Sequence, residues 1–63
     1  MTLRERREAL GLLQRDVAEV VDVAAASVSN WERGKNGIAR KYAKRLAKLY
    51  GCPVKEIMSK EEQ

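Results

Sequence analysis

Apolar residues recur at helical spacing along most of the chain, and residues that commonly begin or end helices separate the segments they form. In the first segment Leu3 and Leu10 lie two helical turns apart, on one face, and Gly11 follows them. Thr2 and Glu5 have the spacing of a capping box, in which each side chain accepts a hydrogen bond from a free backbone amide. The pattern therefore predicts a first helix from Leu3 to about Leu10.

A second amphipathic segment starts near Gln14. Its apolar residues recur at intervals of three and four, and they are Leu13, Val17, Val20 and Val21. This spacing predicts a helix with one apolar face. Asp22 follows, and aspartate tolerates a turn conformation better than most residues, so we expect the helix to end there.

A third helix is predicted over about residues 24–33. Its apolar face would consist of Ala24, Val28 and Trp31. Gly34 stands where a left-handed residue commonly ends a helix. Because only about three residues around Asp22 join this helix to the preceding one, the two are predicted to form a helix-turn-helix unit at about residues 14–33.

A fourth helix is expected after a loop at residues 34–38, which contain two glycines and an asparagine. The helix would run from about Ala39 to Tyr50, and Gly51 would end it. Its buried stripe would consist of Ala39, Tyr42, Ala43, Leu46, Ala47, Leu49 and Tyr50.

A short last helix is predicted after Pro53, which suits the first position of a helix. Its apolar residues would be Val54, Ile57 and Met58. The polar tail at residues 59–63 is expected to fray. The complete pattern contains no convincing strand, so the predicted fold class is all-α, a compact arrangement of five short helices.

The composition limits both the stability of such a fold and the chemistry it can carry. Sixty-three residues predict one domain over residues 1–63, and a chain this short buries only about 60 % of its unfolded surface. With one cysteine and no histidine, neither a disulfide nor a metal or other cofactor is predicted. Enzymatic activity is not predicted either, because Ser27 and Ser29 have no visible base to activate them.

No apolar run approaches the roughly 18 residues that a membrane-spanning helix needs. The N-terminus is basic, but Glu5 and Glu8 interrupt it, and the apolar segment of a signal peptide does not follow. A cytoplasmic location is therefore expected.

The formal net charge is +4, and its distribution is uneven. Residues 33–48 contain seven basic side chains and no acidic one. They are Arg33, Lys35, Arg40, Lys41, Lys44, Arg45 and Lys48. Such a block indicates either a polyanionic partner or simply a solvated helix face, and the charge alone does not distinguish the two.

The helix-turn-helix unit and its surroundings resemble a known family. The segment LRERREALGLLQRDVAEVVDVAAASVSNWERGK, residues 3–35, is similar to phage repressor and Cro-type helix-turn-helix proteins, also called the xenobiotic-response-element type. SVSNWERGK is its most specific part, and LAKLYGCPVKEI, residues 46–57, resembles the family's closing helices. The resemblance implies a lambda-repressor-like five-helix fold and a transcriptional regulator that binds specific sequences of double-stranded DNA.

The resemblance also implies which residues read bases. In the family the recognition helix, here about residues 24–33, enters the major groove, and its groove-facing positions are Ala25, Ala26, Ser29 and Asn30. Asn30 can bond adenine through both amide atoms, Ser29 can donate or accept, and alanine methyls can touch the thymine methyl. The two alanines stand where the family often has Gln or Arg, so DNA shape should carry a larger share of the specificity. They also raise helix propensity, and the two interpretations are compatible.

A second implied group contacts the phosphates on either side of the recognition helix. It consists of Gln14, Ser27, Arg33, Lys35, Asn36 and Arg40. Gln14 would stand at a helix N-terminus, which favours anions, although glutamine there is also simply a good helix former. For Lys44, Arg45 and Lys48 a solvated face is at least as good an interpretation, because these positions run away from the groove.

Other residues are expected to be structural. The resemblance implies an ion pair between Arg7 and Glu32 that orients the recognition helix. Trp31 shares a face with Val28 and is expected in the core, as is Cys52. The chain departs from the family at three positions, Leu13, Ala24 and Asp22. Leu13 and Ala24 replace the usual helix-capping Ser or Thr, and each missing cap costs about 1 kcal/mol.

Partners are predicted less directly. The expected form is a homodimer on an inverted-repeat operator, with the dimer surface around Pro53 to Met58, and no small-molecule effector is evident. An alternative function is a helix-turn-helix interaction module, such as an antitoxin or a regulator subunit acting with a partner protein. A third interpretation takes residues 39–50 as a basic amphipathic helix for membranes or a partner's groove, but its alanine-rich apolar face is too weak for membrane anchoring.

Overall fold

The computed structural model describes residues 2–35 and 37–58, and within these ranges every regular element is a helix. The helices are α1 (Leu3–Ala9), α2 (Gln14–Val21), α3 (Ala25–Arg33), α4 (Arg40–Tyr50) and α5 (Val54–Met58). The predicted all-α class and the order of five helices are confirmed. The predicted fraying at residues 59–63 lies outside the described residues. No described helix has the length and apolarity needed to cross a bilayer.

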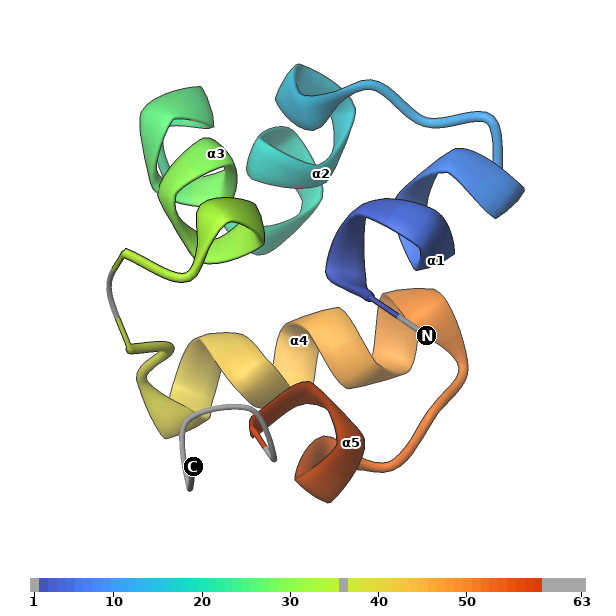
Figure 1. The fold of residues 1–63 in the computed structure, drawn as a ribbon, viewed down its shortest axis with the longest axis vertical. Coiled ribbons are helices and arrows are strands. Elements are labelled where there is room, and N and C mark those ends of the chain that lie inside the picture. The colour runs from blue at the N-terminus through green and yellow to red at the C-terminus, as the bar shows by residue number, and fades with distance from the viewer. Residues whose placement is uncertain (1, 36, 59–63) are drawn as a thin grey trace.

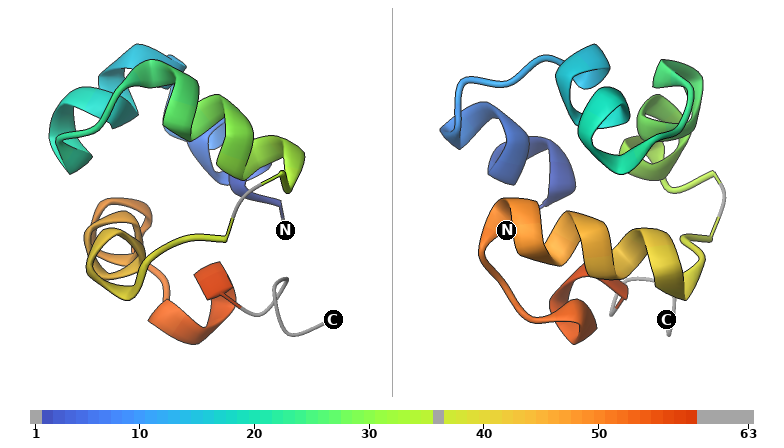
Figure 2. Two further views of the ribbon diagram at one scale, coloured as in Figure 1. Left: turned by 90° about the vertical axis from the view of Figure 1, so that its left-hand side faces the viewer. Right: turned by 180° about the vertical axis from the view of Figure 1, so that it is seen from behind.

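The helices pack around one apolar core. α2 packs on α3 and α4, α1 contacts α3, and α4 packs on α5. Figures 1 and 2 show the resulting arrangement, in which α4 runs between the first three helices and α5. The buried apolar residues are Val17, Ala18, Val21, Val28, Trp31, Ile38, Ala43, Leu46, Ala47 and Ile57.

The helix boundaries follow from local chemistry. The Thr2 amide donates to Glu5 Oε1 at 2.8 Å, and the Glu5 amide donates to Thr2 Oγ1 at 3.1 Å, so the predicted capping box is present. The hydrogen bond from the Thr2 backbone also holds the pKa of Glu5 below its usual value. At the C-terminal end of α2, Asp22 follows the helix directly and has a φ of 70°, so α2 ends where the sequence predicts.

Several predicted core positions are instead exposed, and the prediction was wrong there. Leu13 is 52 % and Val20 is 59 % exposed, because α3 and α4 cover only the Val17 and Val21 side of α2. Ala24 and Ala39 are also exposed, since each precedes its helix as the N-cap. Conversely, Ile38 lies in the predicted loop but is only 5 % exposed.

As the sequence predicts, the N-cap residues of α2 and α3 do not cap their helices with a side chain. Leu13 and Ala24 provide no side-chain hydrogen bond to their helices. At α2 the Leu13 amide donates to Asp16 Oδ2 at 2.8 Å, which supplies the reciprocal half of a capping box. At α3 neither half is present among the described contacts.

Replacing Ala24 by serine should therefore stabilise the protein. The new hydroxyl can accept a hydrogen bond from a free amide in the first turn of α3, which we expect to raise the free energy of unfolding by about 1 kcal/mol. Urea denaturation followed by circular dichroism measures the change. Ala26→Ser adds the same hydroxyl inside the helix and should not stabilise. Equal effects of the two variants would show that capping is not the cause.

Candidate nucleic-acid interface

The predicted base-reading residues lie on the outward side of α3. Ala25 and Ala26 are exposed, and Ser29 and Asn30 are partly exposed. The opposite side of the helix is anchored in the core, where Val28 is 1 % and Trp31 is 7 % exposed. Ser27 is partly exposed as well. The spacing of the apolar residues thus leaves one face of α3 to the core and one to solvent.

The turn between α2 and α3 is held by backbone hydrogen bonds and by a side chain from α4. The amides of Asp22 and Val23 both donate to the Ala18 carbonyl, at 2.8 and 2.9 Å. Arg45 Nη1 donates to the Val21 carbonyl oxygen at 2.8 Å. Arg45 is therefore more than part of a solvated face, which was one of the sequence interpretations, because its guanidinium fixes the end of α2 to α4.

An aromatic contact connects the core-facing side of α3 to α4. The rings of Trp31 and Tyr42 have centroids 5.8 Å apart. The Arg45 guanidinium carbon lies 5.8 Å from the centroid of the Tyr42 ring, within the range of a cation–π contact. The buried side of α3 therefore rests on α4 through a connected set of side chains, which keeps its outward face at a fixed angle to α2.

At the other end of the unit, Arg7, Glu32 and Gln14 connect three helices. Arg7 Nε and Glu32 Oε2 lie 2.6 Å apart, and the two side chains are 10 % and 5 % exposed. Arg7 Nη2 reaches Glu32 Oε1 at 3.2 Å, and Gln14 Nε2 reaches the same oxygen at 3.1 Å. The ion pair expected from the sequence is thus present, and its hydrogen bonds raise the pKa of Arg7 above its usual value. Gln14, placed on the phosphate side by resemblance, also joins the start of α2 to α3.

Tyr50 lies close to this pair and makes stability sensitive to high pH. Burial raises the pKa of Tyr50 from 10.0 to about 12, with a further contribution from Glu32. The folded protein therefore keeps the phenolic proton at pH values where the unfolded chain loses it, so stability should fall as the pH rises from 10 to about 12. We expect a loss of about 1–2 kcal/mol, because solvent screens part of the effect at a half-buried group.

Urea denaturation below pH 10 and near pH 12 tests this expectation. Tyr50→Phe is the matched control, because it has no ionisable proton and should lose less stability over the same interval. If the wild type and Tyr50→Phe lose the same amount, ionisation of other groups such as the lysines explains the pH dependence.

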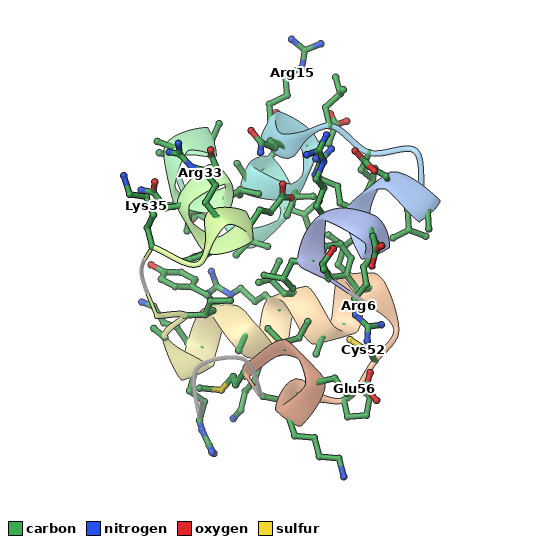
Figure 3. All side chains as sticks on the ribbon, viewed as in Figure 1. Arg6, Arg15, Arg33, Lys35, Cys52 and Glu56 are labelled. Atoms are coloured by element: carbon green, nitrogen blue, oxygen red, sulfur yellow. The ribbon has the colours of Figure 1, made fainter. Side chains whose placement is uncertain are left out.

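Basic side chains flank the outward face of α3. Figure 3 shows Arg33 and Lys35 together at the end of α3, and Arg15 projecting from the start of α2. Arg33 Nη2 donates to Asn30 Oδ1 at 3.2 Å, so one of the predicted phosphate ligands contacts a predicted base reader. Arg40 is exposed at the first position of α4, and Asn36 lies outside the described residues.

The arrangement of cations around the outward face of α3 suits recognition of a polyanion. Within the described ranges, no group of three or more His, Cys, Asp or Glu side chains could hold a metal ion. Cys52 is partly buried and packs against the core. Two helices joined by a tight turn, with the second presenting a face of small side chains beside cations, define a helix-turn-helix nucleic-acid-binding protein.

Comparison with known families agrees. A family model described as helix-turn-helix matches residues 3–57, which is most of the chain. The protein belongs to this family, of the lambda-repressor-like or xenobiotic-response-element type, and is a DNA-binding regulator of transcription. No curated protein and no solved structure matches the chain significantly.

Proposed function

We propose that the protein reads specific sequences of double-stranded DNA as a Cro- or repressor-like transcriptional regulator, with α3 in the major groove. The observation that carries the proposal is the outward face of α3, whose small side chains are exposed or partly exposed and end at the exposed Arg33. A face of small side chains lets the helix lie deep in the groove, close to the base edges. The proposal treats residues 1–63 as one domain acting in the cytoplasm.

Base recognition is assigned to four residues of α3. Asn30 would bond adenine, and Ser29 would donate to or accept from a neighbouring base edge. Ala25 and Ala26 would contact thymine methyl groups and contribute little further information. The remaining specificity would come from the shape and deformability of the DNA, read through backbone contacts.

Phosphate contacts are assigned to the groups around this face. Gln14 and the free amides at the start of α2 would hold one phosphate, since a helix N-terminus favours anions. On the other side the cations Arg33, Lys35 and Arg40 would follow the backbone. Ser27 and Asn36 complete the proposed set.

The proposed form on DNA is a homodimer bound to an inverted repeat. One copy makes few base contacts, so two copies are needed for useful specificity. The half-sites would lie about 10 base pairs apart, one turn of the duplex. The dimer surface is assigned to the segment from Pro53 to Met58, in which Ile57 is buried in the core and Pro53 is exposed.

A second candidate function is supported by the apolar side chains that the fold leaves uncovered. Leu10, Leu13 and Val20 are each more than half exposed. Such residues suit contact with another protein, so the chain could instead act as an antitoxin or as a regulator subunit. In that case DNA binding would require the partner.

A binding selection from a random duplex pool at physiological salt tests the proposal. An enriched inverted repeat with half-sites about 10 base pairs apart would support a dimeric sequence reader. Binding that falls with salt but enriches no sequence would indicate a nonspecific basic protein. The absence of any duplex binding by the isolated chain would favour the interaction module.

A further inference from the structure

A hollow opens between α1, the start of α2 and the second half of α3. Its lining comes from Arg4, Arg7, Gln14, Ser29, Glu32 and Arg33. Gln14, Ser29 and Arg33 belong to the proposed DNA-binding face, so the hollow is continuous with that face. Arg4 and Arg7 extend the lining to α1, a helix to which neither the sequence nor the resemblance assigned a DNA contact.

The hollow carries a net positive charge. Its only carboxylate is Glu32, and both oxygens of that group are occupied, by Arg7 at 2.6 Å and 3.2 Å and by Gln14 at 3.1 Å. Arg7 therefore neutralises Glu32, and two further arginines line the hollow, Arg4, which pairs with Glu8 outside the lining, and Arg33. Two guanidinium groups facing a concave, solvent-open site suit a phosphate, which guanidinium can bind through paired hydrogen bonds.

Arg4 and Arg33 make only weak interactions with their partners in the structure. Arg4 Nε lies 3.0 Å from Glu8 Oε2, but the side chains are 69 % and 52 % exposed. Exposed pairs of this kind contribute little stability, so exchanging Glu8 for a phosphate costs little. Within residues 2–35 and 37–58, the partner of Arg33 is the neutral amide oxygen of Asn30, at 3.2 Å, and this bond uses one of the five N–H donors of the guanidinium.

We infer that the hollow receives a backbone phosphate of the bound duplex, held by Arg4 from α1 and Arg33 from α3. This inference rests on the proposed function and adds α1 to the DNA-binding surface. It makes Arg4 a phosphate ligand whose contribution is independent of sequence, in contrast to the bases read by α3.

The test compares Arg4→Ala with Lys48→Ala, which removes the same charge from the last turn of α4. The dissociation constant is measured against salt concentration for a selected duplex and for an unrelated one. We expect Arg4→Ala to reduce the slope of the log–log plot by about 0.9 on both duplexes, the value for one lost phosphate contact. Arg4→Lys should retain most of the slope, and Lys48→Ala should leave it unchanged.

Equal slopes for Arg4→Ala and wild type, with wild-type binding intact, would overturn the inference and leave the proposed function standing. Failure of the wild type to bind any duplex would overturn both the inference and the proposed function.

A second experiment distinguishes a phosphate of the duplex from a free anion. The NMR resonances of the arginine side chains are followed while inorganic phosphate is added at matched ionic strength. If millimolar phosphate shifted the Arg4 and Arg33 resonances as fully as the duplex does, the hollow would be a free-anion site. Since Arg4 is largely exposed, its variants should keep the wild-type melting temperature.

Discussion

Replacing Glu32 by alanine is expected to lower the free energy of unfolding by about 3–5 kcal/mol, the largest effect that we predict. The substitution removes the closest carboxylate of the buried Arg7 guanidinium, which keeps only the Leu12 carbonyl oxygen at 2.9 Å and the exposed Glu8 at 4.0 Å among the described contacts, and it removes the acceptor of Gln14 as well. An uncompensated buried charge costs more than the intact pair contributes. Small domains rarely have more than about 3–5 kcal/mol of stability in total, so the variant should be largely unfolded at room temperature.

Thermal melting followed by circular dichroism measures this loss, and Glu8→Ala is the matched control. Glu8 pairs with Arg4 on the surface and lies 4.0 Å from Arg7, but its side chain is 52 % exposed, so its removal should cost less than about 1 kcal/mol. A double variant, Arg7→Met with Glu32→Leu, removes both charges and should recover much of the stability lost in Glu32→Ala. If the double variant were no more stable than Glu32→Ala, the unpaired charge would not be the cause.

Replacing Asn30 by alanine should have the largest effect on DNA recognition. In the proposed complex the variant loses both amide hydrogen bonds to one base, which should reduce discrimination at one base pair by about 1–3 kcal/mol. Affinity for duplexes that already carry a different base there should change little. In the structure Asn30 Oδ1 accepts a hydrogen bond from Arg33, which orients the amide and leaves its NH₂ group free to donate.

Lys35→Ala provides the contrast for this prediction. Lys35 is exposed beyond the end of α3 and is proposed to bind a phosphate. Its replacement by alanine should therefore weaken binding to every sequence alike and reduce the salt slope by about 1. Dissociation constants for the selected operator and its single-base variants measure both effects. If Asn30→Ala and Lys35→Ala lowered affinity equally on every duplex, the division between base and phosphate contacts would be wrong.

The helices and their ends could be predicted from the sequence because local chemistry determines them. Thr2 with Glu5 indicates the start of α1, and Asp22, Gly34 and Gly51 each adopt the positive φ that ends a helix. Periodicity was less reliable for burial. It places Leu13 and Val20 on the same side of α2 as Val17, but which part of that side is covered depends on where α3 and α4 pack.

Contacts between distant segments of the chain were the main details that the sequence did not predict. Arg45 reaches the Val21 carbonyl 24 positions earlier, and Arg6 pairs with Glu56 across 50 positions, as Figure 3 shows between α1 and α5. No spacing rule links such positions, because the reach of a long side chain depends on the relative placement of whole helices. Only the pair of Arg7 and Glu32 was expected at this range, and that expectation came from the family resemblance rather than from the pattern.

The position of the single tryptophan makes the recognition helix directly observable. All indole fluorescence of the chain comes from Trp31, which is 7 % exposed on the core side of α3. Its neighbour Tyr42, with ring centroids 5.8 Å apart, is close enough to transfer excitation energy to it. The emission spectrum therefore reports whether α3 is seated on α4, without any attached dye. The indole lies opposite the side of α3 that we propose faces the groove, so binding DNA should leave it buried, while separation of α3 from α4 would shift its emission to longer wavelength.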